Sequence, residues 1–488
     1  MTSKVTINSL STGVPGLDDL LGGGLPEFSF NLIAGQPGCG KTTLAHQIMF
    51  ALATEARPAL YFTVLGEPPL KMLRYQQQFA FFDPAAINRS VRFINLCEEA
   101  MAGDLDQVLA RIAEEVAKYE PALVFVDSFR SVVLATHADG HAHNQLQRFM
   151  QQLGMLMTSW QATTFLIGEY FTDTDANPVF TVADGLIWMR QSVQRNAMVR
   201  KMEIMKMRGQ PSLPGLHSFR ITGDGLQIFV PVAAAAPPAA DMAPTQRASM
   251  GVPGLDEMMN GGLPRGYSLL LAGPSGSGKS ILAAAFLDAG VRNGETGVIA
   301  AFERRPNRVH NKALARHIEA GRISLVESHA TDISIEEVMQ ILATEIRRLG
   351  ASRVVIDSLS GFELALGPSF KDDFRESLLR LVASLTGLGV TVLMTSELED
   401  RYTDLRFSPY GTAFMTDAII VQRYIEVQSR LRRVLAVVKV RDSSHSDELR
   451  EYSIGDGGIE IGTMLAEQEG LLGGRPATRS RGIAAGEA

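Results

Sequence analysis

The stretch Gly273-Pro274-Ser275-Gly276-Ser277-Gly278-Lys279-Ser280 fits the pattern G-x-x-x-x-G-K-[ST] and follows the apolar run Leu269–Ala272. A strand that feeds a glycine-rich turn into a helix is typical of a phosphate-binding loop. The glycines let successive backbone N–H groups point inward, and the helix adds the positive end of its dipole. In such a loop Lys279 reaches the β- and γ-phosphates of ATP, and the Ser280 hydroxyl binds Mg²⁺. The sequence therefore predicts a nucleotide site here.

A second loop of the same kind occurs earlier in the chain. Gly35-Gln36-Pro37-Gly38-Cys39-Gly40-Lys41-Thr42 follows the apolar run Phe30–Ala34, and Thr43 comes next as a further nucleotide-binding candidate. The two loop lysines lie 238 positions apart (279 − 41), and the lead-in Thr12–Pro26 returns at the same spacing as Met250–Pro264. A constant offset over two separate motifs indicates the tandem duplication of one domain.

The length of 488 residues is too great for one ordinary hydrophobic core and predicts two domains. We place the first at 1–230 and the second at 247–465. Residues 231–246 are rich in alanine and proline, which predicts a semi-rigid linker. Residues 466–488 are rich in glycine, alanine and arginine, which predicts a disordered tail.

The composition is that of a soluble globular protein, with 45% hydrophobic and 20% charged residues. Lysine and arginine number 46 against 53 acidic residues, and this net charge of −7 gives no support to a large nucleic-acid surface. Only two cysteines occur, so we expect no disulfide framework and a reducing, cytoplasmic setting. Because no apolar run is long enough to span a bilayer, we expect no membrane partner.

Strands that are apolar throughout alternate with helical stretches in both copies. In the first copy we expect helices beginning near residue 41 and over 69–78, 105–118 and 144–160, and strands over 60–64, 91–95, 122–127 and 164–169. This pattern predicts an α/β fold with a mostly parallel sheet covered by helices on both faces. Alternating segments from Ala183 onward predict an antiparallel extension of that sheet.

A carboxylate that orders Mg²⁺ usually ends a buried strand in proteins with a phosphate loop. Asp127 and Asp357 each end such an apolar run, in Val-Phe-Val-Asp-Ser and Val-Val-Ile-Asp-Ser. An aspartate in this place is also a routine helix cap. Together with Thr42 and Ser280, the two aspartates are the predicted metal ligands.

Hydrolysis also needs a base that orients water toward the γ-phosphate. Glu303 follows the strand after the second phosphate-loop helix and is the predicted base there. In the first copy Leu65 occupies the corresponding place, which leaves Glu67 as a substitute two residues later. We therefore expect the second copy to hydrolyse ATP and the first mainly to hold it. The alternative for Glu303 is an exposed residue that leads into a helix.

These residues together resemble the KaiC-like family of RecA-type ATPases. The shared features are the Gly-Val-Pro-Gly-Leu-Asp lead-in, the phosphate loop, the glutamate after the second strand, the Asp-Ser strand end and a late Lys-x-Arg. The resemblance covers roughly residues 8–230 and 247–463. It implies two tandem RecA-like P-loop domains and double-ring homohexamers that hold ATP between subunits.

In such rings a late lysine and arginine reach the phosphates of the neighbouring subunit. The resemblance assigns this role to Lys206 and Arg208 in the first copy and to Lys439 and Arg441 in the second. A cation supplied by the neighbour stabilises the charge that develops on the transferred phosphoryl group. From the residues alone, these cations read as solvated side chains on an alternating strand.

The clock member of the family phosphorylates itself on an adjacent Ser-Thr pair in its second domain. When the segments are aligned on Thr416-Asp417, the acceptor positions fall on Ala413 and Phe414, which carry no hydroxyl. Thr412 and Thr416 lie close enough to keep serine/threonine autokinase activity open as an alternative.

The resulting hypothesis is a Mg²⁺-dependent ATPase that assembles into a ring and acts as a nucleotide-driven switch or timing assembly, with a regulatory protein as a partner. Three other functions stay open besides this one. They are an autokinase, a recombinase-like DNA-binding ATPase and a scaffold that binds ATP without appreciable turnover.

Overall fold

The computed structural model describes residues 7–64, 69–101, 105–128, 142–171, 178–194, 197–231, 246–302, 312–327, 334–366, 374–398, 415–427, 429–464, 468–469 and 477–478. The chain divides into two compact units, Met1–Val230 and Pro231–Ala488. Each unit contains one nine-stranded sheet, and the two sheets are built alike. We refer to the units as the first and the second domain.

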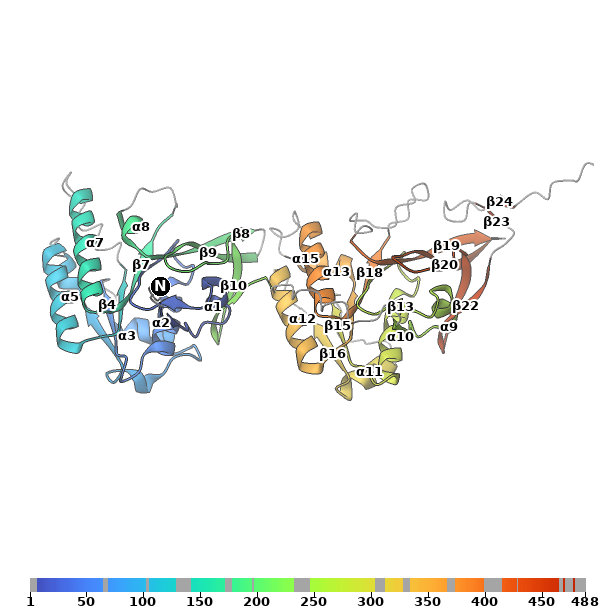
Figure 1. The fold of residues 1–488 in the computed structure, drawn as a ribbon, viewed down its shortest axis with the longest axis horizontal. Helices are drawn as coiled ribbons and strands as arrows, with labels where there is room; N and C mark the ends of the chain where they lie inside the picture. Colours follow the sequence, from blue (N-terminus) through green and yellow to red (C-terminus); the bar gives the residue numbers. More distant parts are fainter. Residues whose placement is uncertain are drawn as a thin grey trace, which may run out of the picture. The chain divides into compact units, whose positions relative to one another are not determined.

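The first domain alternates strands and helices up to its antiparallel end (Figure 1). Its elements are β1 (Ser9–Leu10), α1 (Leu17–Leu21), β2 (Leu25–Pro26), β3 (Phe30–Gly35), α2 (Lys41–Leu52), β4 (Ala59–Thr63), α3 (Pro69–Gln76), the 3-10 turn η1 (Pro84–Ala86), β5 (Val91–Asn95), α4 (Cys97–Met101), α5 (Leu105–Tyr119), β6 (Leu123–Asp127), α7 (Ala142–Ser159), β7 (Thr163–Glu169), α8 (Pro178–Val182), β8 (Gly185–Gln194), β9 (Ala197–Met207), β10 (His217–Thr222) and β11 (Gly225–Phe229).

The second domain repeats the order of the sheet strands, with differences in the short helices between them. Its elements are β12 (Arg247–Ala248), α9 (Pro253–Met258), β13 (Leu263–Pro264), β14 (Ser268–Gly273), α10 (Lys279–Arg292), β15 (Gly297–Ala301), α11 (Lys312–Glu319), β16 (Ile323–Glu327), α12 (Ile335–Leu349), β17 (Arg353–Asp357), α13 (Leu359–Ala365), α15 (Phe374–Gly387), β18 (Thr391–Glu397), β19 (Ala418–Val427), β20 (Arg430–Val440), β21 (Arg450–Gly455), β22 (Gly458–Met464), β23 (Gln468–Glu469) and β24 (Ala477–Thr478).

Each sheet is parallel at one end and antiparallel at the other. The strand order in the first domain is β11-β10-β9-β8-β3-β7-β6-β4-β5. The neighbours in the part β8-β3-β7-β6-β4-β5 all pair in parallel. Strands β8 to β11 then continue the sheet as antiparallel neighbours. The second sheet has the corresponding order β16-β15-β17-β18-β14-β19-β20-β21-β22. The predicted α/β class, with a mostly parallel sheet and an antiparallel extension, is confirmed.

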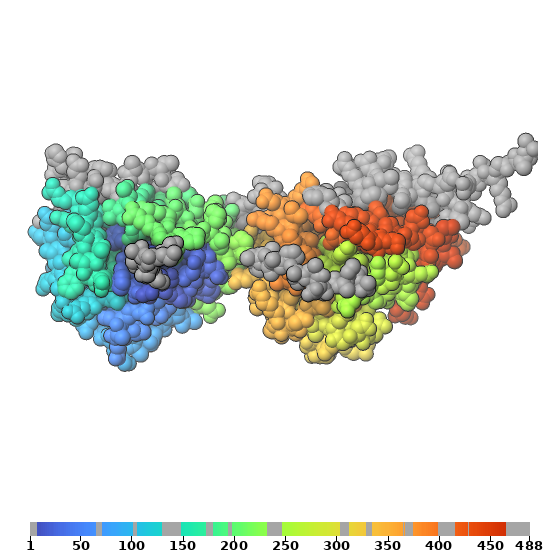
Figure 2. Space-filling view, viewed as in Figure 1, coloured from blue at the N-terminus to red at the C-terminus, as the bar shows by residue number. Residues whose placement is uncertain are grey.

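Helices cover both faces of each sheet because the central strands are apolar on both sides. In the first domain Leu32 and Ala34 of β3 pack into the core beneath α5 and α7, whereas Ile33 packs into the core beneath α1 and α2. The helix pair of each domain, α5 with α7 and α12 with α15, lies at the opposite side of its own domain from the antiparallel strands (Figures 1 and 2). The phosphate-loop strand therefore lies inside the sheet, buried on both faces.

The helices and strands predicted in the first copy are observed with shifts of one or two residues at their ends. The short helices α1, α4 and α8, each of 5 residues, were not predicted, because they are too short to show helical periodicity. Residues 232–245 of the predicted linker lie outside the described residues, as does most of the predicted tail. Within the described part of the tail, β23 pairs with β24. In the part of the chain that the structure describes, no helix is long and apolar enough to cross a membrane.

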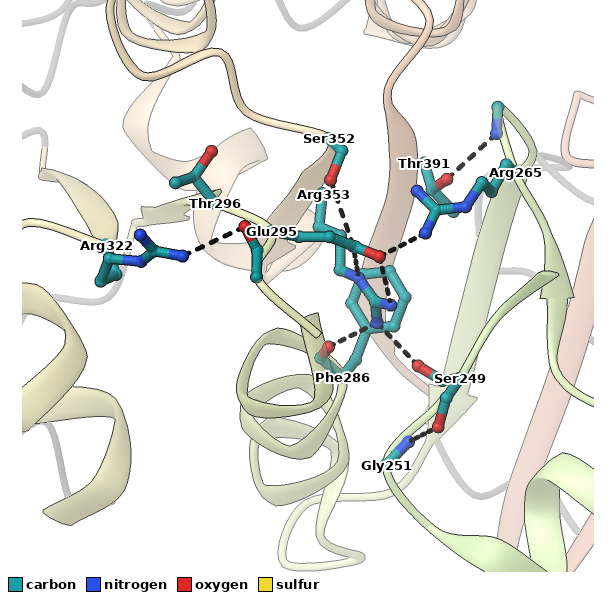
Figure 3. Close-up of polar contacts among 12 residues, drawn as sticks. Ser249, Gly251, Arg265, Phe286, Glu295, Thr296, Arg322, Ser352, Arg353 and Thr391 are labelled. Carbon is teal, nitrogen blue, oxygen red and sulfur yellow. Dashed lines mark hydrogen bonds and ion pairs between the residues drawn. The ribbon is translucent and has the colours of Figure 1, made fainter. Parts of the chain in front are cut away.

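The second domain contains a buried arginine that joins three parts of the fold (Figure 3). Arg353, at the start of β17, is only 1% exposed. Its guanidinium bonds Glu295 at 2.5 Å, and it donates to the carbonyl oxygens of Ser249 and Phe286, each at 2.7 Å. Arg265 also pairs with Glu295. The network ties the segment after the linker to the phosphate-loop helix α10, and the first domain has Leu123 in place of Arg353.

Candidate functional site

The two predicted phosphate loops join a central strand to the helix that follows it. In the first domain β3 ends at Gly35 and α2 begins at Lys41, with Gly40 before it in the left-handed conformation at φ 102°. Gly278 precedes α10 in the same way at φ 96°. No side chain caps either helix start, so the first N–H groups of each helix carry no side-chain acceptor. Uncapped N–H groups at a helix start form a site for an anion such as phosphate.

The loop lysines fold back over their own loops. The Lys41 ammonium donates to the carbonyl oxygen of Gln36 at 2.8 Å, and Lys279 donates to the carbonyls of Gly273 and Pro274 at 2.9 and 2.8 Å. Cys39 is fully buried beneath the first loop, and burial raises the pKa of its thiol above the ordinary value. The positive charge therefore lies at the centre of each loop, where a phosphate group would meet it.

Strands of the antiparallel extension hold each loop in place. In the first domain Gln191 of β8 donates to the carbonyl oxygen of Pro37 at 2.8 Å. In the second, Tyr452 of β21 donates to the Ser277 carbonyl at 2.6 Å, and the Ser277 hydroxyl donates to Gln422 of β19 at 2.9 Å. Sequence reasoning predicted the extension but not these residues, because nothing in an alternating strand marks which side chain reaches the loop.

The remaining loop residues lie in the two loops or in the first turn of the helix that follows each loop. Thr43 is half-buried in the first turn of α2, Gly38 and Gly276 have φ values of 77° and 75°, and Ser275 is exposed. Ser280 is exposed in the first turn of α10.

Asp127 of the first domain is buried beside the phosphate-loop helix. Thr42 and Tyr61 each donate a hydroxyl hydrogen to its Oδ2 atom at 2.7 Å. Burial raises the pKa of Asp127, and the two hydroxyl hydrogen bonds and the charge of Lys41 oppose this rise. The predicted ligands Thr42 and Asp127 therefore meet in the structure, although they are 85 residues apart in the chain.

The second domain supports its aspartate from the other neighbouring strand. Thr395 of β18 donates its hydroxyl hydrogen to Asp357, whereas Ile299 takes the position that corresponds to Tyr61. Asp357 is partly exposed, and Asp127 is buried. The two carboxylates thus have the same place at the end of a central strand but different hydrogen-bond partners.

The oxygen atoms gathered here fit a magnesium ion. Mg²⁺ is bound by one or two protein oxygen ligands together with substrate phosphates and water, and Thr42 with Asp127 supplies this kind of donor set. No group of three His, Cys, Asp or Glu residues that could hold a metal ion occurs among the described residues. The site therefore suits a metal that arrives with the nucleotide.

A buried histidine lies behind Tyr61. The His46 ring is fully buried on α2, one turn after Thr42, and its centroid is 4.6 Å from that of the Tyr61 ring. Neither ring nitrogen has a hydrogen-bond partner among the described residues. Burial lowers the pKa of His46 to about 4, and the nearby Gln76 side chain offsets only part of this effect. The ring is therefore neutral at pH 7.

The predicted bases Glu303 and Glu67 lie outside the described residues, as does Leu65. The residues just before them are described. Val64 and Phe302 donate their backbone N–H groups to the carbonyl oxygens of Asp127 and Asp357, at 2.8 and 3.3 Å. In both domains the chain thus approaches the predicted base position from beside the predicted metal ligand.

The late cations lie at the end of the sheet away from the loop of their own domain. Arg208 forms an ion pair with Asp184 at 3.1 Å, and Asp184 accepts a hydrogen bond from the backbone of Phe30 at the start of β3. Gly35 is five positions after Phe30, so this end of β3 is about 16 Å from the start of the phosphate loop, and Arg208 pairs with Asp184 at this far end. Arg441 repeats this arrangement with Asp417, at 3.3 Å.

The paired lysines have backbone partners in their own domains. Lys206 donates to the carbonyl oxygens of Ala183, Thr181 and Phe180 at 2.5, 3.2 and 3.4 Å, and Lys439 donates to the Thr416 carbonyl at 2.7 Å. Burial lowers the pKa of both lysines. Each lysine thus holds the segment that precedes β8 or β19.

The positions that match the acceptor pair, Ala413 and Phe414, lie outside the described residues, as does Thr412. Thr416 is described and is only 1% exposed. Its hydroxyl is therefore not accessible for phosphate transfer in this conformation.

A further cation accompanies each loop and was missed from the sequence. Arg200 and Arg433 precede Lys206 and Lys439 by six positions (206 − 200 and 439 − 433). Both have a buried Nε atom with no hydrogen-bond partner among the described residues. The charge of Arg200 reaches the Cys39 thiol of the loop, and Arg433 lies over the Tyr424 ring at 5.6 Å. The signal that could have identified them is their repetition at the same spacing from the late lysines.

Comparison with known proteins agrees with the two-domain arrangement. A family model described as "ATPase: KaiC" matches residues 10–233 and again residues 248–466. The chain is 28% identical to the circadian clock oscillator protein KaiC of Rippkaea orientalis, over 96% of this chain and 92% of that protein. It is 28% identical to the protein of the same name from Parathermosynechococcus lividus, over 95% and 87% of the two chains. The circadian clock oscillator protein KaiC 1 of Synechocystis is 27% identical over 96% and 92%.

Proposed function

The chain belongs to the KaiC family of ATPases, and from this membership we propose that it is a Mg²⁺-dependent ATPase that forms a homohexameric ring and works as a nucleotide-driven switch. Each domain holds one ATP at its phosphate loop. ATP joins neighbouring subunits, and hydrolysis changes the surface that a regulatory protein meets in the cytoplasm.

The position of the late arginines carries this proposal. Arg208 and Arg441 are 59% and 47% exposed, and each lies at the sheet end opposite its own loop. Neither can reach a nucleotide held by its own domain, so an arginine of this kind acts on the nucleotide of another subunit. Its charge stabilises the transferring phosphoryl group and makes turnover depend on assembly. Lys206 and Lys439 would have to give up their backbone partners to reach a neighbour's nucleotide. We therefore assign them a smaller part than the arginines in stabilising the transferring phosphoryl group.

The residues of each site then divide the work as follows. Lys279 and the N–H groups at the start of α10 bind and orient the phosphates, while Ser280 and Asp357 hold Mg²⁺, which neutralises phosphate charge. Glu303 orients the attacking water. In the first domain Lys41, Thr42 and Asp127 bind nucleotide in the same way. Leu65 cannot act as a base, so the first domain mainly holds ATP, with Glu67 as its substitute base.

Mixed assemblies test the transfer of an arginine between subunits. Lys279→Ala removes nucleotide binding in the second domain but keeps Arg441, and Arg441→Ala has the opposite defect. We expect each variant alone to be nearly inactive in ATP hydrolysis. Their equimolar mixture should recover about a quarter of the sites, since a functional site forms wherever the two variants meet in the required order. A mixture that stays as inactive as its components contradicts the proposal.

The assignment of the base has its own test. Glu303→Gln should abolish most ATP hydrolysis while ATP binding, measured by equilibrium dialysis, is kept. Hydrolysis by Glu303→Gln at the wild-type rate would show that another group orients the water.

A further inference from the structure

Phe28 adopts a backbone conformation that bulky residues rarely take. Its φ is +63°, in the turn between β2 and β3. The second domain builds the same turn with Gly266 (266 − 28 = 238), at φ +80°. Left-handed backbone is natural for glycine and carries a conformational cost for a residue with a Cβ atom. The first domain thus has a phenylalanine where the turn favours glycine.

The Phe28 ring contributes little to its own turn. In both domains the turn is held by one equivalent hydrogen bond, from the Phe28 N–H to the Thr163 hydroxyl at 2.9 Å and from the Gly266 N–H to the Thr391 hydroxyl at 3.0 Å. The bond needs no side chain at position 28. Phe28 is also 44% exposed, so burial in its own core does not offset the backbone cost.

The ring lies at the same end of the sheet as Arg208. Phe28 is two residues before Phe30, whose backbone bonds Asp184, the ion-pair partner of Arg208. Ile7 is 51% exposed and packs beside Gly209, because a Cβ atom on that glycine would be 2.8 Å from the Ile7 side chain. Two exposed apolar side chains, Ile7 and Phe28, therefore accompany the exposed cation. We call these three residues the Phe28 edge.

The corresponding edge of the second domain lacks the exposed phenylalanine. Gly266 replaces Phe28, and Asp442 follows Arg441 where Gly209 follows Arg208. The cation is thus common to both domains, whereas the exposed phenylalanine ring belongs to the first domain alone. An apolar contact adds binding energy that does not depend on the charge of the nucleotide.

We propose that Phe28 packs against the first domain of a second copy of this chain, beside the phosphate loop of that copy. The occupant follows from charge complementarity, because Arg208 is positive and a phosphate loop that holds ATP presents an anion. The contact rests on the proposed ring assembly. With it, neighbouring first domains would bind each other more tightly than neighbouring second domains do. An exposed aromatic ring that becomes buried is a common centre of binding energy at a protein interface.

Phe28→Gly in the full chain tests this contact, because it installs the residue that the second domain already uses. We expect the thermal unfolding midpoint of the unassembled chain to stay the same or rise. The chain concentration needed for half-assembly with ATP, measured by sedimentation velocity, should increase about tenfold. Phe28→Leu keeps an apolar side chain and should restore most of the assembly. Met155→Ala on α7, where Met155 is 65% exposed, is the matched control and should assemble like the wild type.

Three outcomes contradict the contact. If wild-type chain stays monomeric with ATP, the ring itself is wrong and the Phe28 contact fails with it. If the wild type assembles and Phe28→Gly assembles equally well, the ring stands and only the contact is wrong. A lower unfolding midpoint for Phe28→Gly would show that the Phe28 side chain instead stabilises its own domain.

Discussion

Tyr61 donates its hydroxyl hydrogen to Asp127 at 2.7 Å, and the second domain has Ile299 in the place of this tyrosine. The bond joins β4 to the carboxylate that ends β6. Tyr61 is fully buried, so the carboxylate has no water to replace this donor on that side. The first domain thus stabilises its predicted metal ligand through a contact that lies behind the site.

We therefore expect Tyr61→Phe to destabilise the first domain by about 1.5–3 kcal/mol, the range for a hydrogen bond to a charged group. The pKa of Asp127 should rise further, because one of the hydrogen bonds that oppose the effect of burial is lost. Urea unfolding at pH 7 measures the change, with Tyr75→Phe as the control, since Tyr75 is 61% exposed. Equal stability of both variants would mean that the Tyr61 hydroxyl contributes nothing to the fold.

Because the His46 ring is buried, we expect the first domain to lose stability in mild acid. Its folded pKa is about 4, below the ordinary value of 6.5, so the unfolded chain binds the proton more readily. Above pH 6.5 both states are neutral and there is no effect. Stability is lost as the pH falls from 6.5 toward 4, by about 3 kcal/mol in total.

His46→Phe tests this prediction because it keeps an aromatic ring between Tyr61 and Phe93 but cannot be protonated. The unfolding free energy of this variant, measured between pH 4 and 7, should depend less steeply on pH than that of the wild type. His317→Phe is a control, because His317 is only partly buried and bonds Asp288 at 2.8 Å. Identical pH slopes for His46→Phe and the wild type would assign the acid sensitivity to other groups.

The position of Arg353 should contribute differently to the stability of the two domains. Arg353→Leu installs the residue of the first domain, Leu123, yet we expect it to destabilise the second domain by about 3–5 kcal/mol. The loss arises because Glu295 then keeps, among the described residues, only Arg265 as an ion-pair partner, and the carbonyls of Ser249 and Phe286 lose a donor.

The same network has a pH dependence through Glu295. Burial alone would raise the pKa of Glu295, but the hydrogen bonds and charges of Arg353 and Arg265 lower it overall. Its stabilising contribution is thus present at neutral pH and is lost as the pH falls through the lowered pKa. Denaturant unfolding of Arg353→Leu at pH 7 and in acid should show the difference from wild type shrinking in acid. Arg348→Leu, at an ion pair in which Arg348 is 58% exposed, is the control and should leave the unfolding free energy nearly unchanged.

The phosphate loops and the parallel strands could be predicted because both leave periodic marks in the sequence. A loop motif repeats at a constant offset, and a strand buried on both faces is apolar at every position. The contacts behind the site leave no such mark. Tyr61 and Thr395 read as ordinary strand residues, and only the register of neighbouring strands brings them to Asp127 and Asp357.

Arg353 escaped prediction for a related reason. A charged residue at the start of a strand normally indicates exposure, and this one is buried because glycine leaves room for it. A Cβ atom on Gly290 would lie 2.7 Å from the Arg353 side chain. The glycine within α10 was the signal, since glycine in a helix interior usually has a packing reason.

The two loop lysines give the sharpest test of a division of labour between the domains. Both ammonium groups lie over their loops in the same way, so each substitution removes an equivalent phosphate contact. If the first domain mainly holds ATP, Lys41→Ala should raise the concentration for half-assembly with ATP about tenfold. Lys279→Ala should lower hydrolysis about 100-fold while assembly stays close to the wild type. Light scattering and phosphate release measure the two quantities on the same samples. If the effects were reversed, the second domain would be the one that holds the ring.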